Sequence, residues 1–334
     1  MTEKIYPAWF EPTHTKETEA AYLKRAAGLL KRYSKEKGLP KDEYGKLASW
    51  LEELKPAMAV RSWRLYKAAL VCYLDVIGQY ELRDALKLLN SSGCKAKGKK
   101  SEGNTSQKKK KNVSQIEEET LTQYLNTQRE EYYWALRTLI FFKATLVTGL
   151  RPEEWRDAVY LEENLPGINC ETPALRVKNA KATNGRAHGE YRHLILTNMS
   201  ESDINTILLQ LQFTDVSLTH GLLGSDGKLT WTQYYESIRK CLYRAYKVLF
   251  PRAESLVSIY SCRHQCIADL KTVYSRAEVA AMVGHATDRT ATDHYGKKNY
   301  GRRGRLPKPH PPEVERIRHQ YSARPDKIQS IGLH

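Results

Sequence analysis

A lysine-rich stretch about a third of the way along the chain constrains the fold more than any other feature. The segment SSGCKAKGKKSEGNTSQKKKKNVSQ, residues 91–115, contains eight lysines and one acid, and most of its other residues are small or polar. Such a composition cannot bury enough apolar surface to order itself. The chain must therefore build its cores on either side of this segment, which predicts a flexible linker over 92–115 between two domains.

The balance of charges indicates a polyanionic partner. The 334 residues include 54 Lys and Arg against 38 Asp and Glu, for a net charge of +16. Nucleic acid is the first candidate and an anionic membrane the second, while a basic but unspecialised surface is the alternative. A linker this cationic is expected to contact the DNA backbone, and each phosphate neutralised would steepen the salt dependence of binding. The linker residues assigned to this role are Lys108, Lys109, Lys110 and Lys111.

The sequence predicts no association with a membrane. No apolar run approaches the roughly 20 residues that a membrane-spanning helix needs, and the N-terminal MTEKIYPAWFEP has no apolar signal core. A cytoplasmic, nucleoid-associated location is the expectation. Cys262, His264 and Cys266 do not suggest a metal site, because residues two apart on a helix point away from each other. No nucleotide motif is present either, so we expect neither a metal nor a cofactor.

Residues 14–91 are predicted to form a compact helical domain. Apolar residues recur at helical spacing in three stretches, and YELRDALKLL predicts a fourth helix. Ser62 is the expected N-cap of the third helix. Three basic residues then lie near the start of that helix, where phosphate contacts form readily. These residues are Arg61, Arg64 and Lys67, with an ordinary solvated basic face as the alternative.

Residues 116–300 are predicted to form an α+β domain in which helices dominate, so the whole chain is mainly α. The nearly all-apolar ALRTLIFFKATLVTG predicts a helix buried on most sides. Two strand-like runs, PALRVKNAK and GEYRHLILT, flank an Asn-Gly pair and predict a small antiparallel hairpin, with Lys181 ending its first strand. The basic, proline-rich tail, residues 301–334, contains one predicted short helix in PPEVERIRHQYSA.

The TGLRPEEW motif places a basic residue where the buried helix ends. Arg151 precedes a proline that holds it extended and starts the next helix. Glu154 lies in the first turn of that helix and is expected to orient Arg151. A buried Arg–Glu pair without chemistry is the alternative.

Two further motifs each present one polar residue. In SIYSCRHQ, Ser261 is the expected N-cap, which puts Arg263 in the first helical turn at a natural anion site. In SRAEVAAMVGH, a serine and a glutamate form a capping box, and Gly284 is the expected left-handed residue at the helix end. His285 therefore follows a fixed helix end. Taken singly, each of these residues also has an ordinary structural explanation.

Together, the five residues Arg151, Lys181, Arg263, His285 and Tyr295 resemble the active site of the tyrosine recombinases, also called phage-type integrases. The resemblance runs through TGLRPEE, the hairpin, YSCR and VGHATDRTATDHY. The first domain, with SWRLYKAAL, is similar to the family's four-helix, SAM-like core-binding domain. The two domains together cover almost the whole chain.

The resemblance implies a role for each matching residue. Tyr295 matches the nucleophile, and Lys181 matches the hairpin lysine that protonates the leaving 5′ oxygen. Glu154 matches the acid that supports the first arginine. The groups that hold the scissile phosphate are Arg151, Arg263 and His285. Guanidiniums suit this task because their forked donors match the non-bridging oxygens of a phosphate.

The sequence departs from the family pattern at two points. Tyr260 stands where the family usually has a histidine three residues before the second arginine, and tyrosine is a poor general base near pH 7. The spacing from His285 to Tyr295 is one residue longer than expected, which makes the neighbouring His294 worth checking. Lys178 is a rival to Lys181 as the general acid.

The expected function is that of a site-specific DNA recombinase acting on double-stranded DNA with paired inverted-repeat sites. The resemblance implies a homotetramer on DNA. An accessory DNA-bending or directionality protein is a further expected partner. The helix in PPEVERIRHQYSA is the candidate for exchange between protomers, and folding back on its own domain is the alternative. Two other functions stay open: a non-catalytic DNA-binding protein, and a related strand transferase such as a type IB topoisomerase or a hairpin-forming resolvase.

Overall fold

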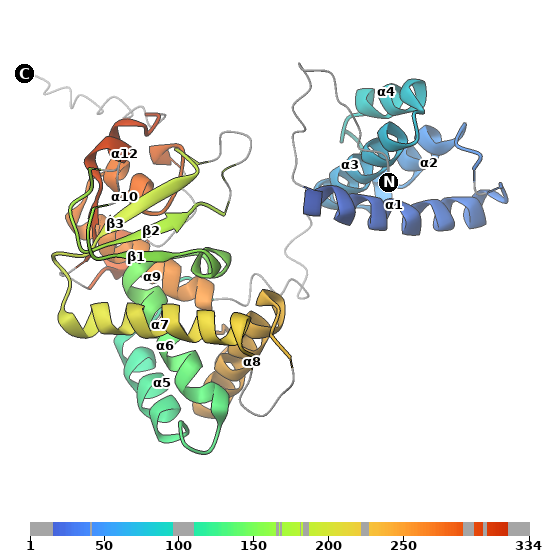
Figure 1. The fold of residues 1–334 in the computed structure, drawn as a ribbon. Helices are drawn as coiled ribbons and strands as arrows, with labels where there is room; N and C mark the ends of the chain where they lie inside the picture. The colour runs from blue at the N-terminus through green and yellow to red at the C-terminus, as the bar shows by residue number, and fades with distance from the viewer. Residues whose placement is uncertain are drawn as a thin grey trace, which may run out of the picture. The chain divides into compact units, whose positions relative to one another are not determined.

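The chain divides into two compact units, Met1–Asn104 and Thr105–His334 (Figure 1). The computed structural model describes residues 16–40, 42–95, 110–164, 167, 169–180, 182, 187–221, 227–289, 297–302 and 306–319. Among these residues, no helix combines the length and the apolar character needed to cross a membrane. The mainly α fold class predicted from the sequence is confirmed.

The first unit contains the four predicted helices. They are α1 (Lys16–Lys37), α2 (Leu47–Glu53), α3 (Val60–Val76) and α4 (Tyr80–Leu88), with a short 3₁₀ helix η1 (Lys55–Ala57). Two buried tryptophans organise the core. Trp50 packs edge-on against Tyr33, and Trp63 donates its indole N–H to the carbonyl of Leu51 at 2.8 Å.

Helix α3 begins three residues earlier than the sequence predicted. Its N-cap is Ala59, in an extended conformation and without a side-chain cap, and not Ser62. The backbone N–H of Lys95 bonds to the carbonyls of Lys55 and Met58 at 3.1 and 3.0 Å, which fixes the chain just before the helix. The start of α3 is therefore accompanied by this long-range backbone contact and not by a capping serine.

The second unit is built from helices around a small sheet. Its helices are α5 (Gln115–Thr127), α6 (Tyr133–Thr148), α7 (Glu201–Thr219), α8 (Trp231–Leu249), α9 (Ile259–Val273), α10 (Arg276–Met282) and α12 (Pro311–Glu315), with 3₁₀ helices η2 (Pro152–Arg156) and η4 (Lys298–Tyr300). Helix α6 is buried along most of its length and contacts α5, α7, α8 and α9. Because it is apolar on all sides, it fits only at the centre of such a bundle.

The sheet lies beside α10 and α12 (Figure 1). It is antiparallel in the order β1 (Val159–Leu161), β2 (Ala174–Lys178), β3 (Tyr191–Ile195) and β4 (Lys308–Pro309). Strands β2 and β3 fall within the two predicted runs, and Val177 pairs with Arg192 in their register. The first strand of the hairpin ends at Lys178, earlier than the sequence predicted. Lys181 lies outside the described residues, and so do residues 183–186.

Both ends of the predicted linker belong to the folded units. Lys95 bonds to the first unit as described above. In the second unit, the Lys110 backbone N–H donates to the carbonyl of Leu256 at 2.9 Å. Ser114 then caps α5 in a capping box with Glu117. The predicted linker 92–115 is thus too long at both ends, and its part over 96–109 lies outside the described residues.

The C-terminal segment folds back on the second unit as far as it is described. Val314 and Ile317 pack on Ala280 and Ala281 of α10. The backbone N–H of Arg318 donates to the carbonyl of Ala286 at 3.0 Å. The fold-back alternative therefore holds for residues 311–318. The remainder of the predicted exchange segment, from residue 320 onward, lies outside the described residues.

Candidate active site

The buried carboxylate of Glu154 forms the centre of a cluster of arginines. The predicted contact with Arg151 is present, since its Nη1 donates to Oε1 at 2.6 Å and its backbone N–H donates to Oε2 at 2.7 Å. Arg192 Nη2 donates to Oε2 at 2.7 Å, and Arg263 Nη1 lies 3.8 Å from the same oxygen. Glu154 thus gathers Arg151 at the N-cap of η2, Arg192 from β3 and Arg263 from α9.

The charges of this cluster favour an anion. Burial would raise the pKa of Glu154, but the positive charges of Arg192, Arg263 and Arg151 hold that pKa well below its usual range. The carboxylate is therefore ionised at neutral pH. Three guanidiniums and one carboxylate, 3 − 1, leave these four side chains with a net charge of +2. All of them are at least nine-tenths buried, where charge interactions are stronger than in water.

Arg263 is placed by helix C-termini, and not by the N-terminus of its own helix. The N-cap of α9 is Ser258, so the prediction of Ser261 as the cap is wrong and Arg263 lies beyond the first turn. Its Nη1 donates to the carbonyl of Gly149 at 2.5 Å, and its Nη2 donates to the carbonyl of Val283 at 2.8 Å. These carbonyls stand at the ends of α6 and α10, where a cation is electrostatically favoured.

His285 follows directly from the end of α10. The capping box of Ser275 with Glu278 starts that helix, and Gly284 with φ +68° ends it, both as predicted. His285 is 3% exposed. Burial, followed by the charges of Arg263, Arg151 and Arg192, lowers its pKa well below the usual value. Its imidazole is therefore neutral at physiological pH and has one N–H to donate.

Arg192 and Asn179 belong to the cluster, and sequence reasoning missed both. Arg192 Nη1 donates to Asn179 Oδ1, and its Nε donates to the carbonyl of Met282 at 2.8 Å. One signal could have found Arg192. It alternates with Leu194 and Leu196 along the strand-like run, so it lies on their apolar face, where a charge needs a partner.

The described residues around the predicted nucleophile are held by the fold. Tyr295 lies outside the described residues, and so does His294. After them, the carbonyl of Tyr300 accepts from Gln265 Nε2 at 2.7 Å, and the backbone N–H of Arg302 donates to Asp269 at 2.9 Å. Both Gln265 and Asp269 belong to α9, which also carries Arg263.

Two other candidates for the catalytic site, Tyr260 and Lys178, are exposed. Tyr260 is 37% exposed and, together with Glu153, contributes to raising the pKa of Tyr235, which burial raises most. Lys178 is exposed, and its ammonium lies 3.6 Å from the carboxylate of Glu190. Its rival Lys181 is outside the described residues.

One of the predicted DNA contacts in the first unit also bonds within the protein. Lys67 Nζ donates to the carbonyls of Lys87 and Leu89 at 2.7 and 2.5 Å, where it caps the end of α4. Burial, and then the charges of Lys55 and Arg64, lower its pKa. Arg61 and Arg64 are exposed, and Arg64 reaches Ser91 at 3.1 Å. Contact of Arg61, Arg64 and Lys67 with DNA stays a prediction, and Lys67 also supports the end of α4.

Lys110 is likewise a structural residue. Its ammonium lies 2.8 Å from both oxygens of Glu117, whose Oε1 also accepts from the hydroxyl of Tyr246 at 2.6 Å. The contact of Lys110 with DNA stays a prediction. Lys111 is exposed, and its charge adds to burial in lowering the pKa of His264 to about 4. Lys108 and Lys109 lie outside the described residues.

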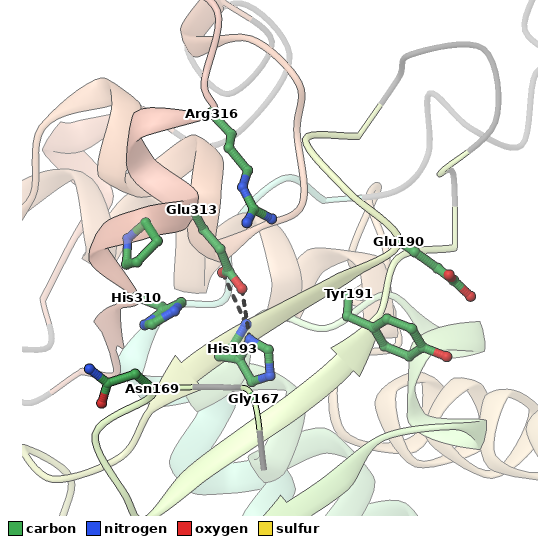
Figure 2. Close-up of a pocket in the computed structure, with 9 residues that line it drawn as sticks. Gly167, Asn169, Glu190, Tyr191, His193, His310, Glu313 and Arg316 are labelled. Carbon is green, nitrogen blue, oxygen red and sulfur yellow. Dashed lines mark hydrogen bonds and ion pairs between the residues drawn. The ribbon is translucent and has the colours of Figure 1, made fainter. Parts of the chain in front are cut away.

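A separate cavity of about 420 Å³ lies between the sheet and α12 (Figure 2). Its main polar contact joins Glu313 to His193: the carboxylate accepts from Nδ1 at 2.7 Å and from the backbone N–H at 3.0 Å. His310 lies edge-on to His193. These contacts hold α12 on β3. Within the described part of the chain, no group of three or more His, Cys, Asp or Glu is arranged to bind a metal.

Comparisons with known proteins find similarity in solved structures. No protein-family model matches the chain, and no curated protein sequence does. A lambda integrase dimer bound to a COC′ core site has a TM-score of 0.48 and 13% identity, over 87% of this chain and 75% of that one. The XerH site-specific recombinase bound to difH, in a pre-cleavage complex, has a TM-score of 0.46 and 15% identity, over 83% of this chain and 75% of that one. The protelomerase TelA covalently complexed with substrate DNA has a TM-score of 0.39 and 13% identity, over 87% of this chain and 91% of that one. All three are tyrosine recombinase family members.

Proposed function

We propose that this protein is a tyrosine site-specific recombinase, which cuts and rejoins DNA strands through a 3′-phosphotyrosyl intermediate. The observation that carries the proposal is the double contact of Arg263. Its guanidinium bonds to the carbonyls of Gly149 and Val283, each two residues before another predicted phosphate ligand, Arg151 or His285. Three residues that are far apart in sequence therefore share one buried anchor, as a common phosphate ligand requires.

The chemistry of the cluster suits the transition state of phosphodiester cleavage. Attack by the phenol oxygen of Tyr295 forms an O–P bond, and the P–O5′ bond breaks. The pentavalent transition state carries more negative charge than the substrate, and Arg151, Arg263 and the neutral His285 offer donors for its non-bridging oxygens. Such preorganised donors contribute a few kcal/mol each. The electron pair of the broken bond goes to the 5′ oxygen, which takes a proton from Lys181.

The phenol must lose its proton during the attack, because its ordinary pKa is about 10. Tyr260 is a poor acceptor, so the proton passes to His285, to water or to the phosphate. The phosphotyrosyl link conserves the bond energy, and a 5′-hydroxyl from another strand then reverses the step. Neither a metal nor a nucleotide cofactor takes part in this scheme.

The proposed substrate is double-stranded DNA with paired inverted-repeat sites, bound by a homotetramer. The proposed contacts to the DNA backbone are Arg61, Arg64 and Lys67 in the first unit and Lys108, Lys109, Lys110 and Lys111 after it. An accessory DNA-bending or directionality protein would act on this complex. Integration, excision and resolution of a mobile element use the same strand transfer, and association with the nucleoid would follow from DNA binding.

A suicide-substrate assay tests the proposal. Duplexes are made from inverted repeats of about ten base pairs in the DNA beside the gene, with a nick that lets the cleaved strand escape. We expect the wild-type chain to form a covalent adduct with the 3′ phosphate and Tyr295→Phe to form none. An equal adduct with Tyr295→Phe, or no adduct with the wild type on any duplex, would show that the enzyme assignment is wrong.

Two alternatives are distinguished by the same duplexes. A non-catalytic DNA-binding protein, suggested by Tyr260 in place of the usual histidine, would bind the repeats without forming an adduct. A type IB topoisomerase or a hairpin-forming strand transferase would form the adduct. A topoisomerase would relax supercoiled plasmid without the paired repeats, and a hairpin-forming enzyme would release covalently closed ends.

A further inference from the structure

The guanidinium of Arg192 joins three separate segments of the second unit. Nη2 donates to Glu154 of η2 at 2.7 Å. Nη1 donates to the side chain of Asn179, which directly follows β2. Nε donates to the carbonyl of Met282 at the end of α10, at 2.8 Å. Each of its three nitrogens therefore holds a different element.

Each of these segments leads to one of the residues proposed to act on the phosphate. Glu154 holds Arg151 through two hydrogen bonds. Asn179 joins the two arms of the hairpin, since its backbone N–H donates to the carbonyl of Glu190 and its Nδ2 to that of Gly189, both at 2.8 Å. Met282 precedes His285 by three residues, and Asn179 precedes Lys181 by two.

The side chains of Asn179 and Arg192 pack tightly against Gly284. A Cβ atom on Gly284 would lie 2.2 Å from Asn179 Oδ1 and 2.9 Å from Arg192 Nη1. The backbone N–H of Ala180 also reaches Glu154, at 3.4 Å. A displacement of any one segment must therefore move the others, because a close-packed interior transmits strain.

We propose that Arg192 is a positioning residue for strand cleavage, which holds the base of the β2–β3 hairpin to Glu154 and to the end of α10. This inference rests on the function proposed above. Arg192 is fully buried, and all three of its nitrogens donate to protein acceptors, so it acts through other residues. A lysine could keep the charge at this position, but its single ammonium cannot reproduce a planar fork that points in three directions.

The test separates the placement of the hairpin from the binding of phosphate. It uses the full-length chain and the cleaved duplex identified above, with the scissile 5′ oxygen either normal or replaced by sulfur. A thiolate is a much weaker base than an alkoxide and leaves without a general acid, since a thiol has a pKa of about 8.5. The sulfur substrate therefore restores cleavage when the general acid is misplaced, but not when a phosphate ligand is lost.

The variants divide the network into its parts. Arg192→Lys removes the fork. Asn179→Ala removes the side-chain bonds of Asn179 to Arg192 and to the carbonyl of Gly189 but leaves the bonds of Arg192 to Glu154 and Met282, which keeps the test valid should Arg192→Lys fail to fold. Lys181→Ala and Arg151→Ala are the references for a lost general acid and a lost phosphate ligand. Arg176→Lys is the matched control, because Arg176 lies in β2 of the same sheet and its guanidinium covers the ring of Tyr191.

We expect Arg192→Lys and Asn179→Ala to slow cleavage of the normal duplex by about 10- to 100-fold, as small misplacements of reacting groups do. The sulfur duplex should restore most of the rate, as for Lys181→Ala and unlike Arg151→Ala. Arg176→Lys should cleave like the wild type on both. Wild-type rates for both network variants, or losses that sulfur does not restore, would overturn the positioning role alone. A wild-type chain that forms no adduct overturns it together with the proposed function.

Discussion

Arg263 Nη2 lies 2.8 Å from the carbonyl oxygen of Val283, two residues before His285. The same guanidinium bonds to Gly149, two residues before Arg151. We expect Arg263→Lys to slow formation of the covalent adduct by about 10²-fold, because one ammonium cannot both hold the two carbonyls and meet a phosphate oxygen. Single-turnover cleavage of the suicide duplex measures this. Arg239→Lys, at an exposed ion pair with Glu236, is the control, and equal rates for the two variants would contradict the role given to Arg263.

Glu154→Gln should destabilise the second unit by about 3–5 kcal/mol, because removing one partner of a buried ion pair leaves the other charges uncompensated. Three guanidiniums lose their shared carboxylate in this variant. Urea unfolding monitored by tryptophan fluorescence gives the free energy. The adjacent Glu153→Gln is the matched control, since Glu153 is exposed and should change stability by less than about 0.5 kcal/mol. Similar values for the two would argue against a buried network.

Gly284→Ala should cost about 1–3 kcal/mol, for two reasons that act together. Its φ of +68° is strained for a residue with a side chain, and the added Cβ would meet Asn179 Oδ1 at 2.2 Å. Gly28→Ala is the opposite case, because Gly28 lies in α1 and no atom comes within 4 Å of the place that a Cβ would take. That change should stabilise the first unit by up to about 1 kcal/mol. Calorimetry measures the unfolding transition of both variants. An unchanged transition temperature for Gly284→Ala would contradict the packing described.

Stability should fall as the pH drops below about 6.5. Burial is the main cause that lowers the pKa values of His188, His264, His285 and His310. The folded-state pKa of each histidine is below the unfolded value of about 6.5. Between these two pKa values the unfolded chain binds more protons than the folded chain, so the free energy of unfolding rises with pH until the pH passes about 6.5.

Urea midpoints at pH 5.5 and 7.5 measure this difference. His264→Gln should reduce it, because the pKa of His264 lies at about 4 in the folded chain. His220→Gln is the control, since His220 is exposed at the end of α7. A midpoint that is higher at pH 5.5 than at pH 7.5 would refute the predicted direction.

Glu313→Gln should loosen the C-terminal segment and cost about 1–3 kcal/mol, because one carboxylate satisfies two donors of His193. Hydrogen exchange of the backbone amides in β3 and α12 reports the loosening directly. Glu315→Gln changes the same short helix at an exposed position and should leave exchange unaltered. Equal protection in the two variants would show that Glu313 does not hold α12 in place.

The local signals in the sequence were sufficient for several parts of the site. The capping box that starts α10, the left-handed Gly284 that ends it, and the pairing of Arg151 with Glu154 all join residues within a few positions of each other. Neighbours on a turn are brought together by the backbone alone, so the pattern of residue types predicts them.

The sequence pattern predicted the wrong N-cap where two serines lie close together in the chain. Both Ser258 and Ser261 precede helical residues, and only Ser258 is the N-cap of α9. The hydroxyl of Ser261 instead donates to the carbonyl of Lys110, more than a hundred residues away in the chain. The same long-range packing engages Lys110 with Glu117 and Lys67 with the end of α4.

The residue types of the proposed site and their order are readable from the sequence, since two arginines, a lysine, a histidine and a tyrosine occur there in motifs that resemble one family. How the described members are held follows from the packing of the folded chain. Arg192 reaches Glu154, Asn179 and Met282 from β3, and Arg263 joins the ends of α6 and α10. A buried guanidinium takes whichever acceptors the packed core places around it, and no spacing along the chain specifies those acceptors.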